Sequence, residues 1–480
     1  MAERFGKRLP GNKVVRRRLD ATQVIPIPYA PRRREIPHVR THAKRFAGAF
    51  LLLVLLGAGL LSMPWVTESG ERTSPLDALF TAISAAAVTG LVVVDTQDHW
   101  NLFGEIVILL LIQAGGLGFM VGASLVLTSL GRGGSLRDSL MLQDGSPTLS
   151  LDEAGDLSKR ILRYILLCEA IGAAALTIQF LPDQPPNVAL WYGIFHSISA
   201  FCNAGFDLQG NFRSLSGYAE SPLINIVTML LIQAGALSFL VVNDMWLHRT
   251  WRRFSYDTKL ITITNAVMLL AGMLAFMAME WNNSMALVAT WAKPMTALFQ
   301  STSARTAGFA SVSFAELQSP TEFLWVALMM IGGAAGSTAG GIKLATLAII
   351  VIAVMSTIRG QSEAQAFGRR ISSQLVFRSM AIIALFLFTH FLLTLGLATT
   401  EDAFGDKDFG FLPIMLETMS AMATVGLSTG ITPELTEGGK ILLSIGMFFG
   451  RLGPLTAVYA LQRRQRPVRY RYAETTVRLG

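Results

Sequence analysis

Charged residues are scarce in this sequence. They make up 15% of its 480 residues, whereas 52% are hydrophobic, and the mean hydropathy is +0.48. A typical soluble domain carries about 25% charged residues. This deficit excludes an ordinary soluble protein, and the long apolar runs that accompany it favour a protein embedded in a lipid bilayer.

Cysteine is almost missing, and so are the residue clusters of enzymes and metal sites. Cys168 and Cys202 are the only two cysteines, too few for a disulfide framework and without the spacing of a metal-ligand set. The chain has no paired His and Glu typical of a zinc site and no combination of nucleophile and base. The sequence therefore predicts neither an enzyme nor an organic cofactor.

Eight apolar segments are long enough to cross roughly 30 Å of hydrocarbon. We expect spanning helices at 47–66, 103–130, 159–181, 221–247, 258–281, 322–358, 373–398 and 437–462. A shorter apolar segment lies between the two members of each pair. Because it is too short to cross the membrane, it is typical of a re-entrant helix and loop.

Four Ser-Ala pairs occur near the ends of these short segments, and each precedes a Gly and then a Leu or Phe. The copies are Ser84-Ala85 to Gly90-Leu91, Ser199-Ala200 to Gly205-Phe206, Ser303-Ala304 to Gly308-Phe309, and Ser420-Ala421 to Gly426-Leu427. Four such turns can meet on one axis, where their carbonyl groups replace the water around an ion. We therefore predict an all-α membrane protein with four tandem helix–pore loop–helix repeats around one pseudo-four-fold pore and eight transmembrane helices.

This organisation divides the chain into six parts. They are a basic tail at 1–46, repeats at 47–130, 159–247, 258–359 and 373–462, and a C-terminal tail at 463–480. The string Leu-Leu-Ile-Gln-Ala-Gly occurs at 110–115 and again at 230–235, which places Gln113 and Gln233 at the same point of two repeats. Duplication explains this register, and helix packing through small residues explains the Gly.

Small and neutral residues precede the four glycines. A ring without carboxylates argues against a site for divalent cations, and Thr424-Val425-Gly426 comes close to the Thr-Val-Gly core of a potassium filter. The short helices would point their partly negative C-terminal ends toward the pore, which favours a cation. We expect K+ to bind at a selectivity filter made of Val88, Thr89, Gly90, Asn203, Ala204, Gly205, Thr306, Ala307, Gly308, Thr424, Val425 and Gly426.

Basic residues gather on one side if each helix pair makes one round trip. The tails, and the stretches between pairs, carry clusters such as Arg16-Arg17-Arg18, Arg252-Arg253 and Arg463-Arg464. Cytoplasmic loops carry such an excess, so we expect both termini in the cytoplasm and the glycine loops opening outward. The same rule explains the net charge of +8 better than nucleic-acid binding does. The first apolar run starts after about 46 polar residues, too late for a cleaved leader.

Five glycines fall within eleven residues in the predicted helix 322–358. Each costs roughly 1 kcal/mol in a helix interior, so the stretch is expected to leave helical geometry and to line a wet cavity. Tight packing of small residues is the alternative. A phosphate-binding loop fails, because Lys343 lacks the required Gly before it and Ser or Thr after it. The residues concerned are Gly332, Gly333, Gly336, Ser337, Thr338, Gly340, Gly341 and Lys343.

Four strings carry a resemblance to a known family. They occupy residues 102–120, 304–309, 335–343 and 450–456, the last reading Gly-Arg-Leu-Gly-Pro-Leu-Thr. The chain resembles the Trk/Ktr/HKT superfamily of potassium transporters over about residues 47–480, and most closely the KtrB-type membrane subunit of bacteria. The resemblance implies potassium uptake through a gated pore in the bacterial inner membrane, with sodium as a candidate activator.

The resemblance also implies partners and residue roles. It implies a homodimer above a cytosolic ring of nucleotide-binding regulatory subunits, which must be separate polypeptides because this chain has no Rossmann fingerprint. It makes the glycine-rich stretch a gating loop below the filter. It places Arg451 just under the filter, where a fixed positive charge would slow cations; a salt bridge with Glu105 or Glu417 is the alternative. Arg305 would frame the third filter rather than lie solvated at the mouth.

Two further interpretations concern the outer mouth of the pore and the mode of transport. Asp95 and Asp207 follow the first two glycine loops and could gather cations at the outer mouth, although most such charges are merely solvated. A secondary symporter for an organic substrate is the rival function, and it predicts two inverted halves with paired broken helices. Four repeats running in the same direction favour the pore instead.

Overall fold

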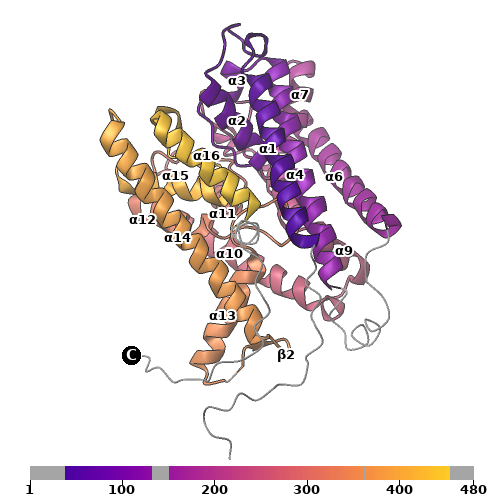
Figure 1. Ribbon diagram of the computed structural model, residues 1–480. Coiled ribbons are helices and arrows are strands. Elements are labelled where there is room, and N and C mark those ends of the chain that lie inside the picture. The colour runs from indigo at the N-terminus through magenta and orange to yellow at the C-terminus, as the bar shows by residue number, and fades with distance from the viewer. Residues whose placement is uncertain (1–37, 132–150, 362, 454–480) are drawn as a thin grey trace, which may run out of the picture.

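The computed structural model describes residues 38–131, 151–361 and 363–453 (Figure 1). These residues are mostly helical, which confirms the coarse form of the predicted fold. The helices are α1 His38–Leu61, α2 Pro75–Ala87, α3 Thr96–His99, α4 Leu102–Gly131, α6 Leu151–Phe180, α7 Pro186–Cys202, α8 Pro222–Ala236, α9 Phe239–His248, α10 Tyr256–Glu280, α11 Lys293–Ser303, α12 Ser319–Met329, α13 Leu344–Ile358, α14 Ser373–Phe404, α15 Phe411–Ala423 and α16 Glu437–Leu452. Strands β1 Gln365–Ala366 and β2 Arg369–Arg370 form one antiparallel hairpin between α13 and α14.

Helix starts follow local chemistry. The hydroxyls of Ser74, Ser255, Ser372 and Thr436 accept a hydrogen bond from the first turn of α2, α10, α14 and α16. Such caps satisfy backbone N–H groups that the helix itself leaves free. Proline stands in the first turn of α2, α7, α8, α11 and α12, where its missing N–H costs nothing.

Length and hydropathy single out three helices of the described residues as able to cross a membrane alone. They lie at Asp156–Phe180, Tyr256–Glu280 and Ser373–Phe404, and the bent pair α8 and α9 adds a fourth when taken as one span. Large apolar side chains on the outer faces support a lipid environment. Leu110, Ile171 and Leu274 each expose 63% of their surface, which water would penalise.

Several predicted helix bounds are wrong. Helix α1 begins at His38 instead of residue 47, and α6 begins at Leu151 instead of residue 159. The expected single helix at 221–247 is two helices, α8 and α9, which meet at 98°. The expected helix at 437–462 is described only up to residue 453, so its last part and the tail at 463–480 lie outside the described residues.

The bend between α8 and α9 has a clear cause in hydrogen bonding. The carbonyl oxygens of Gly235 and Ala236, at the end of α8, accept hydrogen bonds from the backbone N–H groups of Thr338 (3.2 Å) and Ala334 (2.8 Å). A continuing helix would need these carbonyls for itself. Ser238, at φ +70°, turns the chain into α9 instead.

Four short helices, α2, α7, α11 and α15, pack in a cyclic order. Helix α4 packs on α7, α8 on α11, α12 on α15, and α16 returns to pack on α2. Figure 1 shows the first half of the chain, indigo to magenta, on one side and the orange and yellow helices on the other, with α10 and α11 between them. The contact of α16 with α2 joins the end of the described chain to its beginning and closes the arrangement.

Candidate cation pathway

The four short helices end in similar left-handed turns. Helices α2, α7 and α15 have their C-terminal caps at Val88, Asn203 and Thr424, with φ between 51° and 59°. Helix α11 ends at Ala304 without such a cap, and the left-handed residue there is Thr306, at φ 70°. The left-handed residue in each case stands two positions before the loop glycine, so backbone geometry repeats even where side chains differ.

The four loop glycines form a closed ring. Gly90, Gly205, Gly308 and Gly426 all have positive φ, between 73° and 95°. A Cβ atom on Gly90 would meet Ala204, one on Gly205 would meet Gly308, one on Gly308 would meet Val425, and one on Gly426 would meet Thr89. Each glycine therefore abuts the next loop, and the fourth abuts the first. Only glycine suits a position that combines this φ with so close a backbone approach.

The serine of each Ser-Ala pair holds its own loop. Ser84 and Ser420 accept a hydrogen bond from the N–H of Gly90 (3.1 Å) and Gly426 (3.0 Å). Ser199 and Ser303 instead donate to the carbonyl oxygens of Phe206 and Phe309, one residue beyond the glycine. The shared position of the serine in each copy thus fixes loop geometry in two ways, one in the first and fourth loops and the other in the second and third.

Three threonine hydroxyls at the ring are buried without a hydrogen-bond partner among the described residues. They belong to Thr89, Thr306 and Thr424. Buried polar atoms usually have a partner, and an orphan one calls for an explanation. A desolvated cation, or water that accompanies it, would supply the missing partner. The ring itself contains no carboxylate among its loop residues 88–90, 203–205, 306–308 and 424–426.

The glycine-rich stretch between α12 and α13 lies against the ends of two short helices. Thr338 donates from its hydroxyl to the carbonyl oxygen of Phe201 at 3.3 Å. A Cβ on Gly340 would strike the hydroxyl of Thr424 and the carbonyl oxygen of Ala423. The stretch leaves helical geometry as predicted, and a bridge between Ile331 and Ile342 closes its base.

Lys343 and Arg451 bind this stretch through backbone carbonyls. Lys343 Nζ donates to the carbonyl oxygens of Ala339 (2.5 Å) and Gly340 (3.1 Å). Arg451 is 2% exposed and donates to the carbonyl oxygens of Thr338 (2.6 Å) and Gly115 (2.8 Å). Two cationic side chains therefore contact the loop, one from its own C-terminal end and one from α16.

Neither suggested carboxylate partner of Arg451 is hydrogen-bonded to it. Glu105 accepts a hydrogen bond from Trp191 Nε1 at 2.5 Å. Glu417 accepts from Ser428, Thr429 and Thr432, in the segment after the fourth loop. The salt-bridge alternative with these two residues is therefore wrong, because both carboxylates are bound elsewhere.

Arg305 lies in the interior and not at a solvated mouth. Its side chain is 3% exposed, and its guanidinium donates to Asn265 Oδ1. Asn265 in turn donates to Gln233 Oε1 at 2.9 Å. Sequence reasoning missed Asn265, although a lone amide in an apolar spanning helix is a signal of a buried polar contact.

The duplicated glutamines occupy corresponding roles. Gln113 on α4 donates to Glu169 Oε2 on α6 at 3.0 Å, and Gln233 on α8 accepts from Asn265 on α10. Each glutamine thus joins the second helix of one pair to the first helix of the next pair. Glu169, a buried acid within α6, is a second polar residue that sequence reasoning missed.

The acidic residues after the first two loops differ in their surroundings. Asp95 accepts hydrogen bonds from the N–H groups of Gln97 and Phe212, and Asp98 accepts from Asn211, so both hold loop backbone. Asp95 is therefore chiefly structural. Asp207, in contrast, is half-buried; burial raises its pKa to about 7, and the negative charge of Asp95 adds to the rise.

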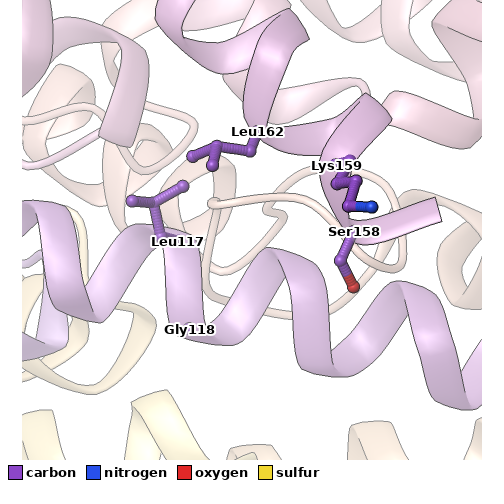
Figure 2. A pocket seen from close by; sticks show the side chains of 5 residues that line it. All are labelled: Leu117, Gly118, Ser158, Lys159 and Leu162. Atoms are coloured by element: carbon purple, nitrogen blue, oxygen red, sulfur yellow. The ribbon is translucent and has the colours of Figure 1, made fainter. Parts of the chain in front are cut away.

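A cavity elsewhere is unrelated to the ring. Figure 2 shows it between α4 and α6, lined by Leu117, Gly118, Ser158, Lys159 and Leu162. Its volume is about 320 Å³, and its lining includes no ring glycine. Its walls are almost entirely apolar, as expected of a surface groove between membrane helices.

These features define a helical membrane protein with a central ring of backbone loops. Residues 57–466 match the TrkH family, described as cation transport protein, and the chain belongs to this family.

Two relatives illustrate the likeness. The Potassium/sodium uptake protein NtpJ of Enterococcus hirae is 35% identical over 90% of this chain and 96% of its own length. The Ktr system potassium uptake protein B of Vibrio alginolyticus is 38% identical over 90% of this chain and 93% of its own.

A solved structure has the same fold. The potassium transporter TrkH from Vibrio parahaemolyticus superimposes with a TM-score of 0.70 over 91% of this chain and 87% of its own, at 20% identity.

Proposed function

We propose that this protein carries potassium into the cell through the ring of Gly90, Gly205, Gly308 and Gly426, as the membrane subunit of a Ktr-like system. The closed ring of glycine loops carries the proposal. Backbone carbonyls gathered on an axis can replace the hydration shell of K+. The names of the relatives, potassium uptake proteins of Ktr and related systems, support the same ion.

The filter comprises residues 88–90, 203–205, 306–308 and 424–426, with the carbonyl groups as ligands of the transported K+. The orphan hydroxyls of Thr89, Thr306 and Thr424 support this assignment. Helices α2, α7 and α15 point their C-terminal ends at the ring, and a helix C-terminus carries partial negative charge that favours a cation.

The wider architecture is four tandem repeats with eight membrane crossings. The cyclic packing of α4, α8, α12 and α16 on the short helices supports it. The basic segments between the pairs support a cytoplasmic position of both termini by the positive-inside rule, in a bacterial inner membrane. The repeats occupy 47–130, 159–247, 258–359 and 373–462.

The gate is the stretch from Gly332 to Lys343, restrained by Arg451. Its contacts with the ends of α7 and α15 support this role, because a loop there stands in the path of an ion leaving the ring. Arg451 adds a fixed positive charge that raises the barrier to cations.

Partners follow from the Ktr names of the relatives, which describe a potassium uptake protein within a system. We propose a homodimer that sits on a cytosolic ring of nucleotide-binding subunits. Sodium acts as an activating ion in this proposal, consistent with the potassium and sodium in the name of one relative.

A secondary symporter is the second candidate. One observation favours it: the α8–α9 pair is broken as well as the α12–α13 pair, and paired broken helices are typical of symporters. A symporter mechanism does not require a ring of four loops, so we prefer potassium uptake through a pore.

Growth rescue tests the proposal. We expect the chain to restore growth of a potassium-uptake-deficient strain at low potassium, with greater effect when a nucleotide-binding partner is coexpressed. Gly205→Val is the matched control, because its side chain would collide with Gly308 and close the ring. Failure of the wild-type chain to rescue, at confirmed membrane expression with the partner, contradicts the proposal.

A further inference from the structure

An aromatic and basic surface forms at the far end of the α8–α9 bend. Trp246, Leu247 and Trp251 expose 73%, 69% and 43% of their surface. Arg249, Arg252 and Arg253 are exposed beside them. We name these six residues the elbow patch.

The elbow patch has a defined shape. Asp244 accepts a hydrogen bond from Ser255 N at 2.9 Å and pairs with His248, which ties α9 to the start of α10. The rings of Trp251 and Phe254 pack edge to face at 5.7 Å. Because the backbone is fixed on both sides, the exposed tryptophans and arginines are held together.

The other end of α9 anchors it in the protein. Phe239 and Val241 are buried, and Phe239 packs on Tyr164 at 5.7 Å. Helix α9 lies at 98° to α8. If α8 crosses the bilayer, α9 lies nearly parallel to the membrane surface. The C-terminal end of α9, which carries Trp246 and Leu247, then lies in the layer of lipid headgroups.

A second basic segment adjoins the elbow patch. Tyr256, at the start of α10, packs edge to face on Phe367 in the β1–β2 hairpin at 5.8 Å. The hairpin carries Arg369 and Arg370, both exposed, and Arg370 pairs with Glu363. Arg369 therefore extends the positive surface beyond α9.

We propose that the elbow patch binds the headgroups of anionic phospholipids. Arginine presents a planar fork of donors that suits phosphate oxygens, and tryptophan rings prefer the boundary between headgroups and acyl chains. An acidic protein would complement the positive charge of the arginines. It would not account for the apolar surface that Trp246, Leu247 and Trp251 expose at the end of apolar helices. The proposal depends on membrane insertion and not on potassium selectivity.

Lipid-dependent fluorescence quenching tests the proposal. The full chain is placed in phosphatidylcholine nanodiscs that contain increasing brominated phosphatidylglycerol or brominated phosphatidylcholine. We expect phosphatidylglycerol to quench tryptophan at a lower mole fraction. Each basic residue near an anionic surface contributes roughly a fivefold preference, so R252Q/R253Q should reduce the preference by about 25-fold.

Two variants make the result specific. W246F/W251F should abolish the preferential quenching, because the proposal assigns the preference to these two of the eight tryptophans. R72Q/R213Q removes the same charge from two exposed arginines in the segments on the other side of the helix pairs and should keep the wild-type preference. An unchanged preference in R252Q/R253Q, equal loss in R72Q/R213Q, or preferential quenching that survives in W246F/W251F overturns the proposal.

Discussion

Arg451 Nη1 donates a hydrogen bond of 2.6 Å to the carbonyl oxygen of Thr338. This contact joins the last described helix, α16, to the glycine-rich stretch, although 113 positions separate the two residues. The same stretch also binds the end of α8 and the end of α7. The proposed gate is thus held by elements from the second and fourth quarters of the chain at once.

Arg451→Ala is expected to increase potassium flux. Removal of a buried positive charge beside the pathway lowers the barrier to a cation, and a decrease of ~1 kcal/mol raises the rate about fivefold. Rubidium uptake at equal membrane expression measures the effect. Arg451→Lys keeps the charge and should stay near the wild-type rate. Unchanged or lower uptake in Arg451→Ala would rule out the barrier role.

Gly90→Ser is expected to weaken the preference for potassium. Gly90 has φ +91°, and its added side chain would meet the backbone of Ala204 in the next loop, so the ring must widen or distort. The ratio of rubidium to sodium uptake should fall. Gly59→Ser is the matched control, because a Cβ at Gly59 meets nothing within 4 Å. An unchanged ratio in Gly90→Ser would contradict the filter assignment.

Ser420→Ala is expected to loosen the fourth loop. The buried N–H of Gly426 would lose its 3.0 Å acceptor, which costs about 1–3 kcal/mol. Lower selectivity for rubidium over sodium and a lower thermal unfolding temperature should follow. Ser62→Ala removes only a hydroxyl that donates to Ala58 O in the last turn of the preceding helix α1 and should change neither. Equal effects in both variants would speak against a specific role of Ser420.

Asn265→Ala is expected to destabilise the protein by about 2–4 kcal/mol, because it leaves the buried Arg305 guanidinium without this acceptor. Thermal unfolding in detergent measures the loss. Asn265→Asp keeps an acceptor for Arg305 and should lose less. If the two variants lose the same stability, the contact with Arg305 is unimportant.

Much of the ring could be predicted from the sequence because its cause is local. A glycine that must adopt positive φ, and a serine six residues earlier that holds it, leave a repeated pattern in the chain, as Ser84 and Gly90 show. The break after α12 was also predictable, since five nearby glycines disfavour a helix. These features depend on residues close in sequence.

The bend at Ser238 and the partners of Arg451 could not be predicted in this way. Residues 221–247 form an apolar run typical of one helix, yet backbone groups of Ala334 and Thr338 take the carbonyls at the end of α8. Glu105 and Glu417 looked available to Arg451, but Trp191 and Ser428 bind them. Competition for hydrogen bonds between distant segments decided both cases.

The sequence by itself determined that this is a membrane protein with four glycine turns, because composition and local backbone preference depend on nearby residues. Tertiary structure alone decided that Gly426 abuts the first loop and closes the ring. It also decided that Arg451 binds the carbonyl oxygens of Thr338 and Gly115, whereas Glu105 and Glu417 bind other partners. The physical reason is that ring closure and the satisfaction of a buried charge depend on which distant backbone groups the packing brings within reach.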